Sequence, residues 1–139
     1  MAISQAMCTS FKSEILGAIH DMDTHTLKMA LYTSTATLDA STTAYSATNE
    51  VSGTNYSAGG VAITNASIAT SGTTAYVDFD DVVFTNVDIT ARGALIYNSS
   101  ASNKAVAVLD FGEDKTATDG DFTVVMPAAG ASTAIIRIA

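Results

Sequence analysis

The stretch Asp88–Phe122 holds two short apolar runs that constrain the fold more than any other part of the chain. The first run is Thr90–Tyr97 and the second is Ala105–Gly112, and both are rich in β-branched and aromatic residues. The polar segment Asn98–Asn103 separates them, so the pattern predicts two antiparallel strands joined by a turn. The interiors of the runs, Ala94–Tyr97 and Ala105–Leu109, carry no charge, which is typical of strands covered on both faces. We therefore expect this hairpin at the centre of a sheet.

The rest of the chain after residue 25 shows the same pattern of short strands. In Leu27–Tyr32 the residues Leu27, Met29 and Leu31 alternate with Lys28, Ala30 and Tyr32, which predicts a half-buried first strand. The pair Gly59–Gly60 predicts a turn with positive φ or a close backbone approach. About eight or nine short strands joined by turns rich in Gly, Asn, Asp and Ser are typical of a β-sandwich or a jelly roll. The sequence thus predicts a mainly β protein in which residues 26–139 form one antiparallel, jelly-roll-like β-sandwich.

Residues 1–25 are expected to form an N-terminal helical arm. Four apolar residues recur at spacings of four, four and three, which places them on one face of an amphipathic helix; they are Phe11, Ile15, Ile19 and Met22. Such a helix either packs on the sandwich or docks on a partner or neighbouring subunit, since apolar helical faces bind in grooves. These four residues are therefore the candidate partner-binding residues.

Length and cysteine content favour one domain without a disulfide. A chain of 139 residues is the size of a single domain. Cys8 is the only cysteine, and a lone thiol in an apolar setting is usually a small buried hydrophobe. We see no run of about 18 apolar residues and no secretion-signal pattern. We therefore expect no membrane partner, and a protein that stays in the cytoplasm where it is made.

Charge argues against a nucleic-acid partner. The net charge is -8, from 14 acidic and 6 basic residues. Nucleic-acid affinity comes mainly from Lys and Arg, which release counterions from the phosphate backbone. Charged residues make up only 14% of the chain, against about a quarter in an average domain. A surface rich in Ser, Thr and Ala suits a protein that is packed into an assembly.

The sequence predicts no catalytic residue, no cofactor and no metal. His20 and His25 are five residues apart, so they do not share a helical face, and no further Cys or His completes a zinc set. We expect both near the end of the helix, where an imidazole can interact with the helix dipole. No nucleophile turn, phosphate-binding loop or dinucleotide fingerprint is present.

Two groups of acidic residues are the remaining candidates for chemistry. They are Asp78, Asp80 and Asp81, and then Glu113, Asp114, Asp119 and Asp121 around an expected turn at 115–118. Their spacing fits no defined calcium loop, so we interpret them as solvated turn carboxylates, with a cation at an interface as the alternative. A glycosidase pair would also need aromatic stacking for the sugar, and the chain has no Trp.

Two motifs resemble a family of small virion proteins of tailed bacteriophages. One is the run from Thr90 to Tyr97, followed by the polar turn and a strand that closes in Leu109-Asp110-Phe111-Gly112. The other is Asn49–Gly60, whose last residues are similar to the Gly-Tyr-x-x-Gly-Gly turn of that family. The chain has Asn55 and Phe84 where the family has Gly and Trp. The likeness covers about residues 27–138, and its motifs are structural, so no catalytic residue is carried over.

The resemblance implies a capsid cement or decoration protein. Such a protein sits on the capsid exterior of the virion, binds the major capsid protein on the outer face of the head lattice, and is a homotrimer. The alternative is a tail, fibre or head-spike component with a receptor- or partner-binding role. Exposed tyrosines in one patch would favour that alternative, whereas buried or scattered ones would favour cement; they are Tyr32, Tyr45, Tyr56, Tyr76 and Tyr97. An enzyme acting on polysaccharide or peptide has no support in the sequence.

Overall fold

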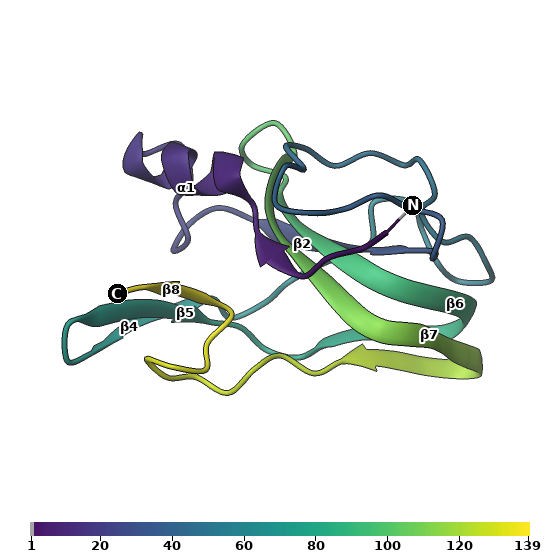
Figure 1. Ribbon diagram of the computed structural model, residues 1–139. Helices are drawn as coiled ribbons and strands as arrows, with labels where there is room; N and C mark the ends of the chain where they lie inside the picture. Colours follow the sequence, from purple (N-terminus) through teal and green to yellow (C-terminus); the bar gives the residue numbers. More distant parts are fainter. Residues whose placement is uncertain (1) are drawn as a thin grey trace.

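The computed structural model describes residues 2–139. These residues form β1 (Ala6–Met7), α1 (Thr9–Leu16), β2 (Leu27–Tyr32), β3 (Val61–Ala62), β4 (Ser67–Ser71), β5 (Thr74–Asp78), β6 (Val82–Asn98), β7 (Lys104–Val124) and β8 (Ile136–Ile138). One sheet has the order β1-β7-β6-β2-β3 and the other β4-β5-β8. Every pairing between these strands is antiparallel. The fold is a mainly β sandwich with one short N-terminal helix (Figure 1), as the sequence predicts.

The predicted hairpin is the centre of the larger sheet. β6 lies between β7 and β2, and the turn after Asn98 returns the chain at Lys104, which pairs with it. Ala94–Tyr97 and Ala105–Val108 are buried on both faces, as expected for apolar runs without charge. β2 differs from its prediction as half-buried. Only Lys28 is partly exposed, because successive side chains of β2 point to opposite faces and both faces are covered.

β6 and β7 are far longer than the sequence predicts. The expected turn at 115–118 is wrong, since these residues belong to β7 and Thr116 pairs with Thr90. The register of the β6–β7 ladder shifts at four places, and the largest shift lies in its middle, where Arg92 alone stands opposite residues 111–114. One residue facing four forces the ribbon to bend, as a β-bulge does. Figure 1 shows this bend, at which β7 turns back beneath itself.

Local chemistry at the bend fits its shape. Gly112 has φ 83, a conformation in which other residues are strained. The Gly112 amide donates to the Asp110 carboxylate at 2.8 Å, and Arg92 Nε lies 3.2 Å from the same oxygen. Gly93 leaves room for Ile3, whose side chain a Cβ on Gly93 would overlap. Arg92, Asp110 and Gly112 of the first motif therefore form the bend of the hairpin.

The second motif fastens the loop before β3 to the edge of β2. Gly59 and Gly60 have φ 94 and 75, which confirms the predicted positive φ. Asn55 has φ 64, so it occupies a left-handed position that suits glycine, and its side chain donates to the Asn86 carbonyl at 2.9 Å. Phe84 is buried in the core. Asn55 thus stands in a conformation that glycine also adopts, and Phe84 fills a buried position with an aromatic ring.

The N-terminal helix is shorter than the sequence predicts, and the N-terminal segment packs more deeply against the core. α1 ends at Leu16, because Gly17 caps it and Ala18 takes φ 60, which a helix cannot continue. The expected stripe on one helix is therefore wrong for Ile19 and Met22, which lie beyond the helix end. Phe11 is buried in the core, and α1 contacts β7.

Candidate functional site

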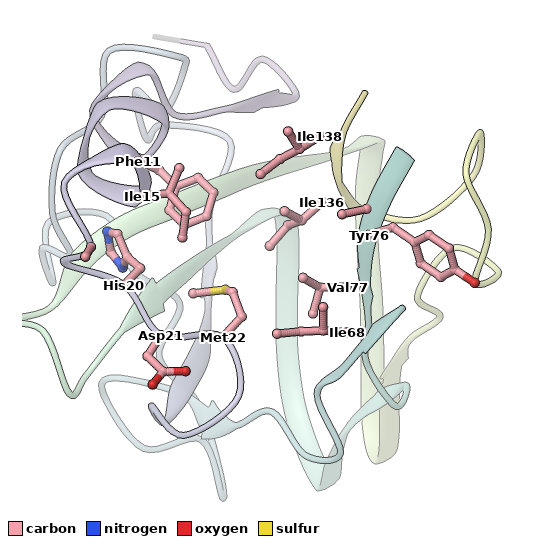
Figure 2. Close-up of a pocket in the computed structure, with 12 residues that line it drawn as sticks. Phe11, Ile15, His20, Asp21, Met22, Ile68, Tyr76, Val77, Ile136 and Ile138 are labelled. Atoms are coloured by element: carbon pink, nitrogen blue, oxygen red, sulfur yellow. The ribbon is translucent and has the colours of Figure 1, made fainter. Parts of the chain in front are cut away.

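An apolar groove lies between the N-terminal segment and the small sheet. Its cavity volume is about 390 Å³, and most of its lining is aliphatic or aromatic. One wall is Phe11 and Ile15 of α1, and the opposite wall includes Ile136 and Ile138 of β8. Figure 2 shows these two walls facing each other, with the Met22 side chain below Phe11 and across from Val77 and Ile68. The groove therefore joins elements from the two ends of the chain.

The four candidate partner-binding residues have different environments. Phe11, Ile15 and Met22 line the groove, whereas Ile19 is not among its lining residues. Phe11 and Met22 are buried, Ile15 is half-buried, and Ile19 is 43% exposed. Three of the four side chains thus form the groove itself, and Ile19 stands outside it next to His20. Their role in partner binding stays a prediction.

Exposed aliphatic side chains gather at this groove. Ile68 and Ile138 line it and are 54% and 57% exposed. Leu16, the neighbour of Ile15, is 88% exposed. Elsewhere in residues 2–139, the large apolar side chains that are exposed are Ile19, Val83 and Val125. Exposed apolar side chains that line a groove are typical of an interaction surface.

A buried histidine holds the segment after α1 in place. His20 Nε2 lies 3.0 Å from Glu14 Oε1, and Glu14 Oε2 lies 3.4 Å from Lys104 Nζ. His20 Nδ1 lies 3.0 Å from the Asn98 side-chain nitrogen. The expected position of His20 near a helix end is correct, but its partners are the side chains of Glu14 in α1 and Asn98 in the central hairpin rather than the helix dipole. This network ties one wall of the groove to the hairpin.

The hydrogen bonds of Asn98 determine which ring nitrogen of His20 and His25 carries the proton in the neutral ring. The Ser100 amide donates to Asn98 Oδ1 at 3.0 Å, so the Asn98 amide nitrogen faces the rings. That nitrogen lies within 3.0 Å of His20 Nδ1 and at 2.9 Å from His25 Nδ1. Because an amide nitrogen only donates, both Nδ1 atoms accept and both neutral rings carry their proton on Nε2. His20 Nε2 then donates to Glu14.

A second network surrounds Glu50, which pairs with Tyr32 at the end of β2. Glu50 Oε1 accepts from Tyr45 at 2.6 Å, and Oε2 accepts from Tyr56 at 2.6 Å and from the Gly59 amide at 2.8 Å. The Tyr56 hydroxyl also accepts from the Leu31 amide at 2.8 Å. These bonds fasten the loop before β3 to β2, so Glu50 has a structural role that the sequence analysis missed. Its isolation between Asp39 and Asp78 as a single charge was the available signal.

The tyrosines serve the fold rather than an exposed patch. Tyr32 and Tyr97 are buried and donate to the carbonyls of Ser46 and Gly59 at 2.6 Å. Tyr45 stacks on Tyr97 with ring centroids 4.8 Å apart. Tyr76 is half-buried and points away from the groove in Figure 2. No exposed tyrosine cluster forms within residues 2–139.

We expect the stability of the protein to fall as pH rises above about 10, the usual pKa of tyrosine. Burial, followed by the hydrogen bond to Glu50, raises the pKa of Tyr56, and burial followed by the Glu50 charge raises the pKa of Tyr32. A raised pKa in the folded state stabilises the protein below the unfolded pKa. That contribution is lost above it, because only the unfolded chain releases the proton. Urea unfolding at pH 8 and pH 11 measures the loss.

Tyr56→Phe is the matched variant for the alkaline prediction. It removes the proton but keeps the ring, which stacks on Phe84 with centroids 5.8 Å apart. Its stability should fall less between pH 8 and pH 11 than that of the unchanged protein. Equal losses for the two proteins would contradict the assignment of the effect to Tyr56.

The acidic groups do not converge. Asp81 Oδ1 accepts from the Met126 amide at 2.7 Å, and Asp121 Oδ1 accepts from the Asn86 amide at 3.0 Å. Within residues 2–139, no three His, Cys, Asp or Glu side chains are placed to hold a metal ion together. These two carboxylates therefore have structural hydrogen bonds of their own.

Cys8 lies in the core, as predicted. Its side chain is fully buried. Burial, together with the charges of Asp39 and Glu14, raises the pKa of the Cys8 thiol to about 11. The thiolate that reacts with other groups is therefore scarce at neutral pH.

The groove depends on residues that the sequence analysis did not single out. Ile68, Ile136 and Ile138 come from the small sheet, and nothing in the sequence indicates that they share a face. No helix in residues 2–139 is long and apolar enough to cross a membrane. Comparison with known proteins adds no relative: no protein-family model, curated protein or solved structure matches this chain.

Proposed function

We propose that this protein is a non-enzymatic structural protein of a tailed-bacteriophage virion, a cement protein on the capsid exterior. It binds the major capsid protein on the outer face of the head lattice and stabilises the assembled shell. The resemblance of the two motifs is what points to the virion. The homotrimer that the resemblance implies stays a prediction.

The apolar groove is the observation that carries a binding role. Ile68 and Ile138 line it while more than half exposed. A side chain left in water in this way loses the roughly 1.5–3 kcal/mol that burial of an aliphatic residue provides. A partner with a complementary apolar segment recovers this free energy. The groove is therefore the proposed contact with the capsid protein.

The tyrosines favour cement over the receptor-binding alternative. Recognition surfaces rely on exposed aromatic side chains. Here Tyr32, Tyr45, Tyr56 and Tyr97 hydrogen-bond within the fold. They are consequently not available as a shared patch for a receptor.

Stabilisation of a shell follows from mass action. A protein that binds the assembled lattice, and not its separate subunits, stabilises the lattice by its binding free energy. Weak single contacts suffice when many copies bind at once to a repeating surface, because linked contacts gain avidity. The net charge of -8 keeps the protein away from the packaged genome, in agreement with an outer position.

Ile138→Asp tests the proposal. The substitution puts a charge into the apolar groove, and we expect at least a tenfold loss of affinity for isolated phage heads in a co-sedimentation assay, equivalent to about 1.4 kcal/mol. Val83→Asp is the control, because Val83 is similarly exposed at 45% and lies outside the groove.

Electron cryo-microscopy of the decorated heads locates the protein. Density at regular sites over the outer lattice, lost with Ile138→Asp, is the expected result. Density confined to the tail, or undiminished decoration by Ile138→Asp, would overturn the proposal.

A further inference from the structure

β4 is an edge strand whose outer side is open. It pairs with β5 from Ser67 opposite Asp78 to Ser71 opposite Thr74. Four of its five residues are exposed. In the described part of the chain, no backbone hydrogen bond joins it to any other segment. Its outward N–H and C=O groups are therefore free to pair with another strand.

The other open edges are protected in ways that β4 is not. Natural sheets protect their edges with charges, proline or very short strands. β1 and β3 have two residues each, and β8 carries Arg137. The outer half of β7 carries Glu113, Asp114, Lys115, Asp119 and Asp121. β4 reads Ser-Ile-Ala-Thr-Ser, with neither charge nor proline.

The distribution of charge favours a second copy of the chain as the strand that pairs with β4. A chain of net charge -8 repels its own copies over most of its surface. Residues 51–77, which include β3, β4 and most of β5, contain no Asp, Glu, Lys, Arg or His. This stretch is where two copies can approach without like-charge repulsion.

We propose that two copies pair antiparallel through β4, around a two-fold axis at Ala69. In that register Ser67 stands opposite Ser71 of the second copy, and Ile68 stands opposite Thr70. The residues at the contact are small apart from Ile68, so the backbones can approach to normal strand spacing. The two three-stranded sheets then form one continuous six-stranded sheet, in which the β4 strand of each copy is paired on both sides.

The pairing also covers part of the groove rim. Ile68 pairs with Val77 in the sheet, and both line the groove, so this face of β4 is the groove face. Ile68, which is 54% exposed in one copy, packs beside Thr70 of the other. Both grooves then lie on the same face of the joined sheet. A two-fold contact closes as a dimer, whereas a trimer needs two different surfaces, so this pairing is an alternative to the homotrimer that the resemblance implies.

Molar mass in solution tests the pairing. Light scattering after gel filtration should give the mass of a dimer for the unchanged protein. Thr70→Lys should weaken dimerisation at least tenfold, because the new charges of the two copies lie close together across the axis. Thr118→Lys is the control, since Thr118 is also exposed on a strand but lies in β7. A monomer at about 100 μM, a trimer, or a Thr70→Lys dimer of unchanged affinity would overturn the proposal.

Cysteine cross-linking tests the register without disturbing the edge. Ala69→Cys places two thiols directly opposite each other, with Cα atoms about 4.5–5.5 Å apart, which a disulfide can span. Diamide, which takes up the two electrons and two protons, should convert this variant to a covalent dimer. Ser67→Cys is the control, because its two thiols would be about 14 Å apart. Equal cross-linking of both variants, or of neither, would overturn the pairing.

The outcome is separable from that of the proposed function. Thr70 and Ala69 do not line the groove, and Ile138 is not in β4. Loss of head binding by Ile138→Asp with an intact dimer supports both proposals. A monomer that still decorates heads overturns only the β4 pairing.

Discussion

Alanine in place of Gly60 is expected to lower the free energy of unfolding by about 3 kcal/mol or more, which is enough to unfold many single domains. Gly60 has φ 75, where a residue with a Cβ loses about 1–2 kcal/mol. A Cβ there would also overlap the Met29 carbonyl, which belongs to the backbone of β2 and cannot move without distorting the central sheet. Urea unfolding followed by circular dichroism measures the loss.

Gly72→Ala separates the two causes. Gly72 has φ 60, so it carries a similar backbone cost, but a Cβ at this position would meet no atom within 4 Å. Its loss should therefore be only about 1–2 kcal/mol. A Gly60→Ala protein that is as stable as Gly72→Ala would show that β2 and the loop before β3 are not in close contact.

Glu50→Ala is expected to cost about 2–4 kcal/mol of stability. The carboxylate accepts from Tyr45, Tyr56 and the Gly59 amide, and its removal leaves three donors without this acceptor. Hydrogen bonds to a charged group contribute about 1.5–3 kcal/mol each. Partial exposure of Glu50 lets water replace some of them, so the expected cost is below the sum. Chemical unfolding at pH 7 measures it.

Glu113→Ala is the matched control for the Glu50 network. Glu113 has a 74% exposed side chain, and its salt bridge is to Lys115 at 3.2 Å. Exposed pairs of this kind contribute at most about 1 kcal/mol. If removal of Glu50 were no more harmful than removal of Glu113, the tyrosine network would be dispensable for folding.

The parts of the fold that are formed by residues close together in the chain could be predicted from the sequence. The central hairpin is one example, because the polar turn Asn98–Asn103 lies between two apolar segments without charge, Ala94–Tyr97 and Ala105–Leu109. The length of its strands could not be predicted. Lys115, Thr116 and Thr118 read as a turn because they are polar, but they are the exposed residues of a strand in which Ala117 points to the core.

The helical stripe shows where periodicity misleads. Phe11, Ile15, Ile19 and Met22 fit a helical period, yet Gly17 and Ala18 end the helix after Leu16. Met22 still reaches the core, because the turn after the helix leads it there. The spacing predicted that the four residues share one apolar helical face, whereas three of them line the groove and only Phe11 and Ile15 lie on the helix.

The groove itself could not be read from the sequence. Its walls, α1 and β8, are at opposite ends of the chain, and no local pattern indicates that they meet. Glu50 is different, because a single charge in a long uncharged stretch is visible in the sequence. Its importance became clear only once Tyr45, Tyr56 and Gly59 were found around it.

The order of the strands along the chain also determines how the molecule can come apart. β6 and β7 belong to the larger sheet but lie between β5 and β8 in the sequence, and β4 and β5 lie between strands of the larger sheet, so neither sheet is encoded by a continuous segment. Ala75 of β5 pairs with Ile138 of β8, which lies 63 residues further along the chain, so the smaller sheet is completed by the C-terminal strand. A cut between β2 and β8 therefore separates strands that pair in at least one sheet, whereas an insertion in the turn at residues 99–103 interrupts no strand.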